Sequence, residues 1–460
     1  MDLSVFKAYD VRGVVPTQLN EQLAYLVGRA YAALAKPKAV AVGRDVRATS
    51  QPLMESLMNG LLDGGVNVYD LGLCGTEEVN FAAASMKLGG GIMVTASHNP
   101  IQYNGLKILG PHAKTLEEPY GLQDMRRWIE QHHNALPAVG AKGVHRALEH
   151  LTPYLDHLTS VVNVASFKPL KLVANCGNGC AGPTLLALQK RLPMLEIVPM
   201  FETPDGTFPN GIPNPLLPEN RAATTAAVLA HKADLGLAWD GDYDRCFLFD
   251  AEGQFVSPYQ LGSVLAMAYL HKYPAAKIVH DPRLEWNTRA AITAAGGEAV
   301  RVRCGYSFIK KAMREVGAVF GAEASGHFFF ADFNFGDSGM LPWLKTVELM
   351  SATGQTLAQL VQAANTAAYA CDEVNVTLPT PALDALTTLE HELAPQATEV
   401  LKIDGLSLTF AEWRCNIRSS NTEPLLRLNV EGKTAALADK HQHALLERLL
   451  AMGGQLAGGH

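Results

Sequence analysis

Three aspartates stand at alternate positions, Asp240, Asp242 and Asp244, between the apolar runs LGLAW and CFLF. Carboxylates this close raise one another's pKa unless a hard cation neutralises them, which indicates a divalent metal site. A helix-loop-helix calcium site is excluded, because glycine and glutamate are needed where this chain has Arg245 and Ala251. Few ligands beside an arginine favour Mg²⁺ shared with a phosphate group. The alternative is a solvated acidic turn.

A second polar segment, Thr95 to Pro100 (TASHNP), directly follows the apolar run GGIMV. Hydroxyls and backbone N–H groups at the carboxyl end of such a strand lie where α/β proteins bind ligands. A serine hydroxyl is a poor nucleophile unless a neighbour activates it, so Ser97 needs a partner such as the aspartates. The alternative is a turn that only leaves the strand.

Two further segments carry polar groups that could bind hydroxyl or phosphate groups. In Gly321 to His327, the residues Glu323, Ser325 and His327 alternate, so on an extended backbone they would share one face and could bind hydroxyl groups. The histidine could equally be structural. In Arg418 to Pro424 (RSSNTEP), with Arg427 beyond, hydroxyls, an amide and arginine forks could cradle a phosphate; a hairpin turn is the alternative.

One motif points to another class of function. The residues Gly177 to Gly182 fit G-x-G-x-x-G after the strand KLVAN, and Glu202 follows about 20 residues on, as in dinucleotide-binding proteins. A dinucleotide-binding oxidoreductase would leave the aspartates, Ser97 and the Arg418 loop without a role. It is therefore a remote alternative.

The elements that would hold these loops follow a repeating order. Strand-like KAVAVG, helical QPLMESLMNGLLDGG and strand-like VNVYDLG form a βαβ pattern, which recurs after KLVANCG and after AKIVHD. The chain then changes to a smaller α+β pattern that ends in a helix from about Ala435. We therefore expect domains at residues 1–148, 149–251, 252–368 and 369–460.

Composition limits the partners and the compartment. The chain has 460 residues and a formal net charge of −7, which disfavours nucleic acid and anionic membranes as partners. No apolar run approaches the ~18 residues that a membrane span needs, and MDLSVFKAYD does not look like a signal peptide. The seven cysteines are scattered, which suggests neither disulfides nor a paired zinc site. We expect a cytoplasmic protein.

In this order, the four polar segments resemble those of the α-D-phosphohexomutase superfamily, and within it the bacterial phosphomannomutase/phosphoglucomutase group. The likeness covers nearly the whole chain, from KAYDVRG through FPNGIPNPLLPEN and DPRLEWNT to RSSNTEP. It implies three related mixed α/β domains around a central cleft plus a smaller C-terminal α+β domain. Each domain would contribute one loop to the cleft, and the protein is expected to be a monomer.

The resemblance also implies roles for single residues. It makes Ser97 the phosphoserine and assigns Mg²⁺ to Asp240, Asp242, Asp244 and the phosphoserine. It counts Lys107, Arg12, Arg245 and His327 as catalytic groups, and His98 and Asn99 as supports of the serine loop. Sugar binding is implied for Glu323, Ser325 and Tyr306. Phosphate binding is implied for Tyr9, Arg283, Arg418, Ser420, Asn421, Thr422 and Arg427.

The implied reaction interconverts hexose 6-phosphate and hexose 1-phosphate through a hexose 1,6-bisphosphate, which would also serve as activator. Lys107 or His327 would take the proton of the attacking hydroxyl. Mannose phosphate is favoured, with glucose phosphate as a second substrate. Both sugars have the equatorial O3 and O4 that Glu323 and Ser325 would bind, so these two residues would not tell them apart. Phosphoglucomutase or phosphoglucosamine mutase as the main activity is the alternative. Tyr306 departs from the usual histidine, which bears on phosphate affinity or substrate preference.

Overall fold

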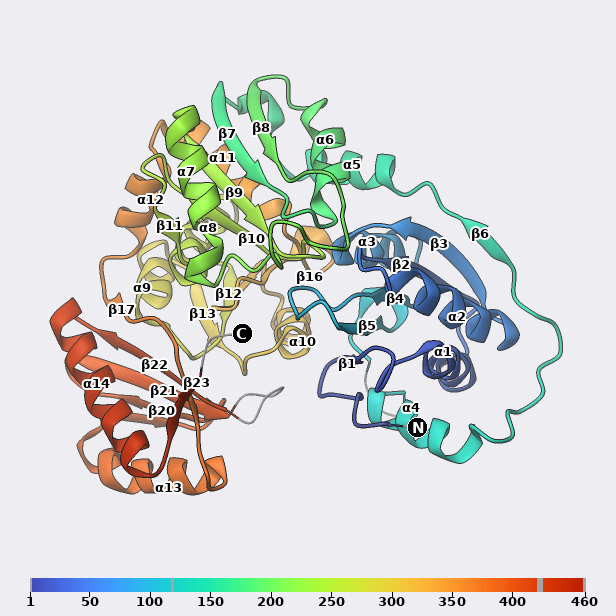
Figure 1. The fold of residues 1–460 in the computed structure, drawn as a ribbon. Helices are drawn as coiled ribbons and strands as arrows, with labels where there is room; N and C mark the ends of the chain where they lie inside the picture. The colour runs from blue at the N-terminus through green and yellow to red at the C-terminus, as the bar shows by residue number, and fades with distance from the viewer. Residues whose placement is uncertain (1, 117–119, 420–424, 458–460) are drawn as a thin grey trace. The chain divides into compact units, whose positions relative to one another are not determined.

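The structure is a computed structural model that describes residues 2–116, 120–419 and 425–457 (Figure 1). The chain forms two compact units. Unit 1 contains Met1–Phe255 and Phe330–Leu357, and unit 2 contains Val256–Phe329 and Ala358–His460.

The first sheet of unit 1 has the strand order β1-β5-β4-β2-β3-β6. Its parallel strands are β2 (Ala39–Arg44), β3 (Asn67–Leu73), β4 (Gly91–Val94) and β6 (His145–Ala147). The antiparallel strands are β1 (Val11–Val14) and β5 (Tyr103–Leu109). The helices of this region are α1 (Glu21–Ala35), α2 (Ser50–Asp63), α3 (Thr76–Ser85) and α4 (Leu122–His132).

Alternation along the strands decides which helix covers which face of this sheet. Val40 and Val42 of β2 join the apolar cluster of α1, α2 and α4, whereas Ala41 between them joins the cluster that contains Val79 of α3. Successive side chains of a strand point to opposite faces, so the sheet lies between two helical layers.

The second sheet of unit 1 has the order β11-β10-β9-β7-β8. Its strands are β7 (Leu170–Asn175), β8 (Leu195–Met200), β9 (Leu235–Trp239), β10 (Cys246–Phe249) and β11 (Phe255–Val256). Unit 1 also contains α5 (Leu151–Ser160), α6 (Ala181–Gln189), α7 (Ala222–His231), β16 (Gly336–Asp337) and α11 (Leu341–Thr353). Every residue of β9 and β10 is buried, and Trp239 pairs with Cys246, so the aspartate segment is the loop of a buried antiparallel hairpin.

Within unit 2, one sheet runs β13-β12-β14-β15. It consists of β12 (Lys277–His280), β13 (Glu298–Arg301), β14 (Phe320–Ala322) and β15 (Phe328–Phe330), and β12 is parallel to β13 and β14. Its helices are α8 (Pro258–Lys272), α9 (Trp286–Ala294), α10 (Tyr306–Val316) and α12 (Leu357–Ala364). Helix α8 begins at a capping box, in which Ser257 and Gln260 bond each other's backbone N–H groups and Pro258 occupies the first turn.

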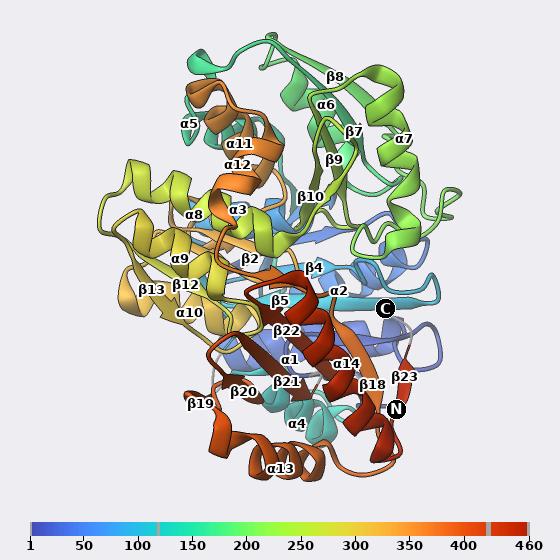
Figure 2. The same cartoon turned by 90° about the vertical axis from the view of Figure 1, so that its left-hand side faces the viewer.

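The C-terminal part of unit 2 is an antiparallel sheet of order β19-β20-β21-β22-β18-β23 (Figure 2). Strand β17 also pairs with β22. Its strands are β17 (Tyr369–Ala370), β18 (Val374–Thr377), β19 (Glu399–Leu401), β20 (Leu406–Thr409), β21 (Trp413–Ser419), β22 (Leu426–Gly432) and β23 (Gln455–Ala457). Helices α13 (Ala382–Leu393) and α14 (Ala435–Ala451) share one apolar cluster with the sheet. Short 3₁₀ turns lie at Pro111–Ala113, Val164–Ser166, Pro218–Asn220, Ala331–Phe333 and Ala394–Gln396.

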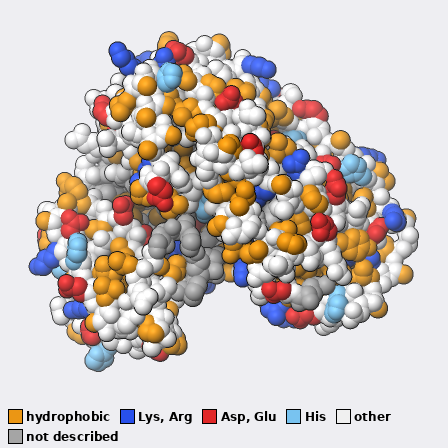
Figure 3. All heavy atoms as spheres, in the orientation of Figure 1, with side chains coloured by type: hydrophobic (Ala, Val, Ile, Leu, Met, Phe, Trp, Pro, Cys, Tyr) orange, Lys and Arg blue, Asp and Glu red, His pale blue; other side chains and the backbone are white. Residues whose placement is uncertain are grey.

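The expected fold class of three mixed α/β regions and a C-terminal α+β region is confirmed. None of the helices in the described part of the chain is long and apolar enough to cross a bilayer. On the face drawn in Figure 3, lysine and arginine side chains are interspersed with aspartate and glutamate side chains.

Candidate active site

Ser97 follows β4 by three residues and is buried, with a left-handed backbone at φ 49°. Its backbone N–H donates to Oγ1 of Thr95 at 2.8 Å, and that hydroxyl donates to Oδ2 of Asp45 at 2.8 Å. Asp45 follows β2, the strand beside β4, so the end of one parallel strand supports the loop of its neighbour. A left-handed backbone is unusual for serine and persists only when its surroundings hold it.

Arg47 is the main clamp on this loop. Its fully buried guanidinium donates to the carbonyl oxygens of Ser97 at 2.9 Å, Asn99 at 2.6 Å, Pro100 at 3.0 Å and Tyr103 at 3.1 Å. The planar fork of arginine suits such a set of acceptors better than a lysine would. Sequence reasoning missed both Asp45 and Arg47, because neither belongs to a motif that carries chemistry by itself.

The hairpin loop between β9 and β10 meets the serine loop directly. Oγ of Ser97 donates to Oδ2 of Asp240 at 2.8 Å. The close approach depends on Gly241, because a Cβ atom there would lie 2.6 Å from the carbonyl oxygen of Ser97. The structure therefore brings the expected serine and the expected aspartates together.

The three aspartates fit a divalent cation. Each offers an oxygen within 4.8 Å of the others, and all three side chains are buried. Oδ1 of Asp242 is buried and has no hydrogen-bond partner among the described residues, which is costly for a carboxylate unless a cation binds it. Burial and the neighbouring Asp244 and Asp242 raise the pKa of Asp240 to about 7, although Arg245 opposes this.

Lys107, on β5, places a positive charge against two of the aspartates. Its Nζ lies 2.7 Å from Oδ2 of Asp242 and 2.5 Å from Oδ2 of Asp244. Burial disfavours the ammonium form, but the two carboxylates outweigh it and raise the pKa of Lys107 above its ordinary value. Burial likewise opposes ionisation of Asp242, yet Lys107 and the hydroxyl of Thr76 hold the pKa of this carboxyl below its usual value.

Arg245 and Arg12 add two further positive charges close to the serine loop. Nη2 of Arg245 donates to Oδ2 of Asp240 at 2.8 Å and also contacts Nδ1 of His98. Burial and these two arginines lower the pKa of His98 well below its usual value, so its imidazole is neutral and can accept from Arg245. Arg12, on β1, donates to the carbonyl oxygen of Ala96 at 2.9 Å and to Oδ1 of Asn99.

Unit 2 contains a polar cluster around Glu323. Nη2 of Arg283 lies 2.8 Å from Oδ2 of Asp281 and 3.3 Å from Oε1 of Glu323. Burial raises the pKa of the Cys304 thiol well above its ordinary value, so its S–H group donates to Oε1 of Glu323 at 2.8 Å. Asp281 and Cys304 were not expected from the sequence, since a lone aspartate and a lone cysteine carry no spacing signal.

The expectation of an extended backbone from Glu323 to His327 is wrong. The N–H of Gly326 donates to the carbonyl of Glu323 at 2.9 Å, and the N–H of Glu323 donates to the carbonyl of His327 at 3.0 Å, so the segment is a tight turn between β14 and β15. The turn nevertheless gathers the three side chains. Nδ1 of His327 lies 3.0 Å from Oγ of Ser325 and 3.6 Å from Oε2 of Glu323.

Four other expected residues lie on β21, on β22, at the start of α10 and before β1. Arg418 on β21 and Arg427 on β22 are cross-strand partners, and Arg418 is buried with its Nε 3.7 Å from Oδ2 of Asp404. Tyr306 begins α10 with Nζ of Lys310 5.4 Å from its ring centre. Tyr9 lies in the segment before β1. The expected phosphate ligands Ser420, Asn421 and Thr422 lie outside the described residues.

Comparison with known proteins places the chain in a family. Models of the phosphoglucomutase/phosphomannomutase family match alpha/beta/alpha domain I at residues 3–134, domain II at 152–253, domain III at 257–367 and the C-terminal domain at 373–448. A phosphomannomutase of Salmonella montevideo is 49% identical over 438 residues, which cover 94% of this chain and 95% of that protein. The chain belongs to the phosphoglucomutase/phosphomannomutase family.

Other family members give the same result. A phosphomannomutase of Escherichia coli K12 is 47% identical over 94% of this chain and 95% of its own length. A protein named phosphohexose mutases from Xanthomonas campestris pv. campestris is 47% identical over 96% of this chain and 98% of its own length. A crystal structure of a phosphoglucomutase/phosphomannomutase family protein from Burkholderia thailandensis superimposes with a TM-score of 0.87 at 30% identity, covering 98% of this chain and 99% of that one.

In this family member, two of the glycines that fit a dinucleotide motif lie in close contact with backbone atoms of other segments. A Cβ atom on Gly182 would lie 1.8 Å from the carbonyl oxygen of Glu202, and one on Gly179 would lie 2.7 Å from that of Gly241. The N–H of Cys180 donates to the same Gly241 oxygen at 3.1 Å. Backbone atoms therefore lie against these glycines. In a dinucleotide-binding protein, the pyrophosphate of the ligand would approach the chain at the same place.

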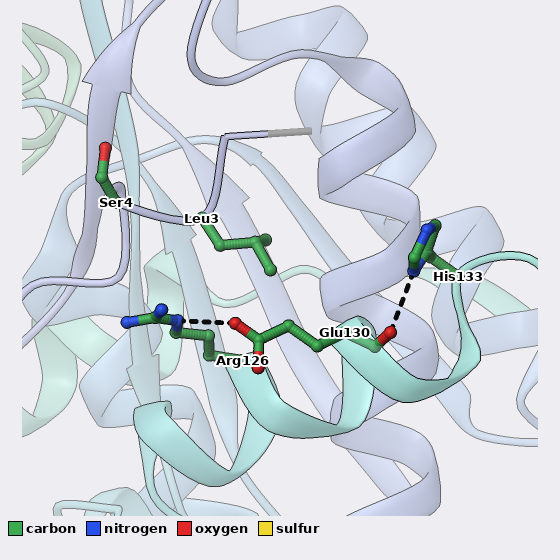
Figure 4. Close-up of a pocket in the computed structure, with 5 residues that line it drawn as sticks. All are labelled: Leu3, Ser4, Arg126, Glu130 and His133. Carbon is green, nitrogen blue, oxygen red and sulfur yellow. Dashed lines mark hydrogen bonds and ion pairs between the residues drawn. The ribbon is translucent and has the colours of Figure 1, made fainter.

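A hollow of about 500 Å³ lies elsewhere on unit 1, beside α4 (Figure 4). It is lined by Leu3, Ser4, Arg126, Glu130 and His133, of which Ser4, Glu130 and His133 are exposed. Nε of Arg126 pairs with Oε1 of Glu130 at 3.1 Å within it. None of the residues around Ser97 contributes to this hollow.

Proposed function

We propose that this protein interconverts hexose 6-phosphates and hexose 1-phosphates by transferring a phosphoryl group to and from Ser97. The observation that carries the proposal is the contact of Oγ of Ser97 with Oδ2 of Asp240, inside a cluster of three buried aspartates. A buried serine hydroxyl beside a candidate cation site and two arginines suits phosphoryl transfer, in which charge neutralisation and positioning do most of the work.

The proposed reaction has two balanced steps. In the first, the bond between phosphorus and Oγ of phosphorylated Ser97 breaks while a bond forms to the free hydroxyl oxygen of the hexose phosphate. The resulting hexose 1,6-bisphosphate then reorients in the site. In the second step, the bond between its other phosphorus and the sugar oxygen breaks while a bond forms to Oγ of Ser97. In each step the attacking hydroxyl loses one proton and the departing oxygen gains one to become a hydroxyl group, so that atoms and charge balance.

The residues of this chain divide the task. Asp240, Asp242 and Asp244, with the phosphoserine, would hold Mg²⁺, which when bound supplies charge neutralisation for the phosphoryl oxygens. Lys107, Arg12 and Arg245 add positive charge, while Arg47 and His98 hold the loop. Because the carboxylates keep Lys107 protonated, it suits an electrostatic role better than that of a base. His327 is therefore the proposed base.

The substrate's sugar and distal phosphate would bind to unit 2. Glu323, held by Arg283 and Cys304, and Ser325 would accept and donate hydrogen bonds to O3 and O4. The cross-strand pair Arg418 and Arg427, with Arg283, would provide forks for the phosphate, together with the expected Ser420, Asn421 and Thr422. Tyr9 and Tyr306 are further proposed phosphate and sugar contacts.

Mannose phosphate is the proposed main substrate, with glucose phosphate second, because the named relatives from Salmonella and Escherichia are phosphomannomutases. Coupled assays on mannose 1-phosphate, glucose 1-phosphate and glucosamine 1-phosphate, with a hexose 1,6-bisphosphate as activator, test this choice. Turnover on mannose and glucose phosphates that stops with a chelator and returns with Mg²⁺ is expected. Activity confined to glucosamine phosphate, or full activity in excess chelator, would contradict the proposal.

A further inference from the structure

Tyr243 stands between two of the proposed magnesium ligands, Asp242 and Asp244, in an unusual conformation. Its φ is 42°, in the left-handed region, and its side chain is completely buried. Residues with a Cβ atom adopt this backbone rarely, and mainly where the surroundings hold them. Because Tyr243 lies between Asp242 and Asp244 in the chain, its backbone conformation also affects the directions in which these two carboxylates point.

A carboxylate of another part of unit 1 holds the Tyr243 hydroxyl. This hydroxyl donates to Oε1 of Glu78, on α3, and lies 3.2 Å from Oγ1 of Thr184. The same Glu78 oxygen accepts the N–H of Gly75 at 3.0 Å, and its other oxygen lies 2.6 Å from Nε2 of His150. Both oxygens of a buried carboxylate therefore have partners, which fixes the position to which Tyr243 is tied.

The first turn of α3 contacts the aspartate loop at two adjacent residues. A Cβ atom on Gly75 would lie 2.1 Å from the Tyr243 ring, so the ring packs against bare backbone. The N–H of Thr76 donates to the carbonyl oxygen of Asp242 at 3.0 Å, and its hydroxyl donates to Oδ2 of Asp242 at 2.5 Å. One helix start thus holds both Asp242 and the residue after it.

If the Tyr243 side chain only filled the core, it would need no hydroxyl group and none of these polar contacts. A phenylalanine fills the same volume, whereas the hydroxyl adds a directed bond to a carboxylate that is buried among other partners. Groups that orient metal ligands through hydrogen bonds commonly change metal affinity when they are removed.

We propose that Tyr243, anchored on Glu78, is a positioning residue that sets the orientation of Asp242 and Asp244 toward the cation. The inference rests on the proposed metal role of the three aspartates. It assigns the tyrosine hydroxyl a role in cation affinity and not only in folding.

The test measures Mn²⁺ binding by the loss of the free-ion electron paramagnetic resonance signal, on full-length protein with its Ser97 phosphorylation matched by intact mass. Tyr243→Phe should raise the Mn²⁺ dissociation constant about tenfold or more. Thr184→Val removes the second partner of the Tyr243 hydroxyl and also a donor to Oε1 of Glu78, and it should raise this constant about threefold. The matched control is Tyr31→Phe, because the buried Tyr31 hydroxyl bonds only the backbone carbonyls of Gly89 and Leu109 among the described residues.

The control variant should bind Mn²⁺ as the unaltered protein does. A dissociation constant for Tyr243→Phe within twofold of the unaltered value would overturn the inference, and so would an equal loss in Tyr31→Phe. Asp242→Asn separates this from the proposed function. If Asp242→Asn binds Mn²⁺ as tightly as the unaltered protein, the proposed metal role of the aspartates is wrong. If Asp242→Asn binds Mn²⁺ more weakly but Tyr243→Phe binds it as tightly as the unaltered protein, the metal role of the aspartates stands and the positioning role of Tyr243 is wrong.

Discussion

Nζ of Lys107 donates to Oδ2 of Asp242 at 2.7 Å, so the ammonium group of this lysine contacts an oxygen atom that is also a candidate metal ligand. The lysine offsets the mutual repulsion of the aspartates, and for the same reason it competes with a divalent ion for them. The proposed catalytic role of Lys107 and its effect on metal binding can therefore be measured separately.

Lys107→Met should therefore tighten divalent-ion binding while lowering turnover. We expect the Mn²⁺ dissociation constant to fall severalfold, because one positive charge leaves a buried cluster, and the maximal rate to fall by about a hundredfold or more. The control is Lys142→Met, because the exposed amine of Lys142 pairs with Asp63 at 2.7 Å on the surface of unit 1. Weaker metal binding in Lys107→Met would contradict the competition.

The second prediction concerns the phosphoryl carrier. A fraction of freshly purified protein should carry one phosphate, and peptide mapping should locate it on Ser97, the hydroxyl that contacts Asp240. Ser97→Ala should lose this phosphate and nearly all turnover, because no other oxygen would carry the group. A stable phosphate on another serine, with full turnover in Ser97→Ala, would rule the mechanism out.

The third prediction tests the clamp on the serine loop. Arg47→Lys keeps the charge but loses the fork that serves four carbonyl oxygens, so buried acceptors lose their donors. We expect the free energy of unfolding to fall by about 2–4 kcal/mol in chemical denaturation, with slower turnover in the folded variant. Arg127→Lys, at an exposed arginine, is the control and should change neither quantity. Unchanged stability of Arg47→Lys would show that the clamp is unimportant.

The fourth prediction is a pH dependence of stability that depends on His150. Burial lowers the pKa of this histidine, but its hydrogen bond to Glu78 and the charges of Glu78 and Glu149 outweigh burial, so the pKa is raised above 6.5 in the folded protein. A raised folded pKa stabilises the fold most below the unfolded pKa, and the contribution is lost as pH rises through the folded pKa.

The measurement compares the unfolding free energies of the unaltered protein and His150→Gln from about pH 5.5 upward. The difference in favour of the unaltered protein should be largest at the acidic end and shrink as pH increases above 6.5. A difference that does not change with pH would mean that the charge of His150 contributes nothing to stability.

The fifth prediction concerns Tyr306, at the start of α10. If its hydroxyl only donates a hydrogen bond to substrate, Tyr306→Phe should weaken binding by roughly 0.5–1.5 kcal/mol, or about tenfold at most, and leave the maximal rate almost unchanged. Steady-state kinetics of Tyr306→Phe and Tyr306→His on mannose and glucose phosphates check this. A collapse of the maximal rate at unchanged apparent affinity would make Tyr306 a proton carrier instead.

Local sequence by itself determined the strands and helices around each loop and the chemistry that each loop carries. The alternating aspartates exclude a calcium loop and indicate a cation because their charges are neighbours in the chain. Ser97 stands out because it follows an apolar strand, and the βαβ order of the chain predicts the α/β class. Such features depend on residues a few positions apart, so no knowledge of packing is needed to recognise them.

Tertiary structure alone decided which distant groups hold these loops. Arg47 bonds Ser97 across 50 residues of the chain because β2 and β4 are adjacent strands, and Glu78 bonds Tyr243 across 165 residues because the first turn of α3 contacts the loop between β9 and β10. The same packing shows why Gly179 and Gly182 are glycines, and a turn rather than an extended strand brings Glu323 close to His327. A buried polar group must find a partner wherever the fold supplies one, and the spacing of residues in the chain does not record that choice.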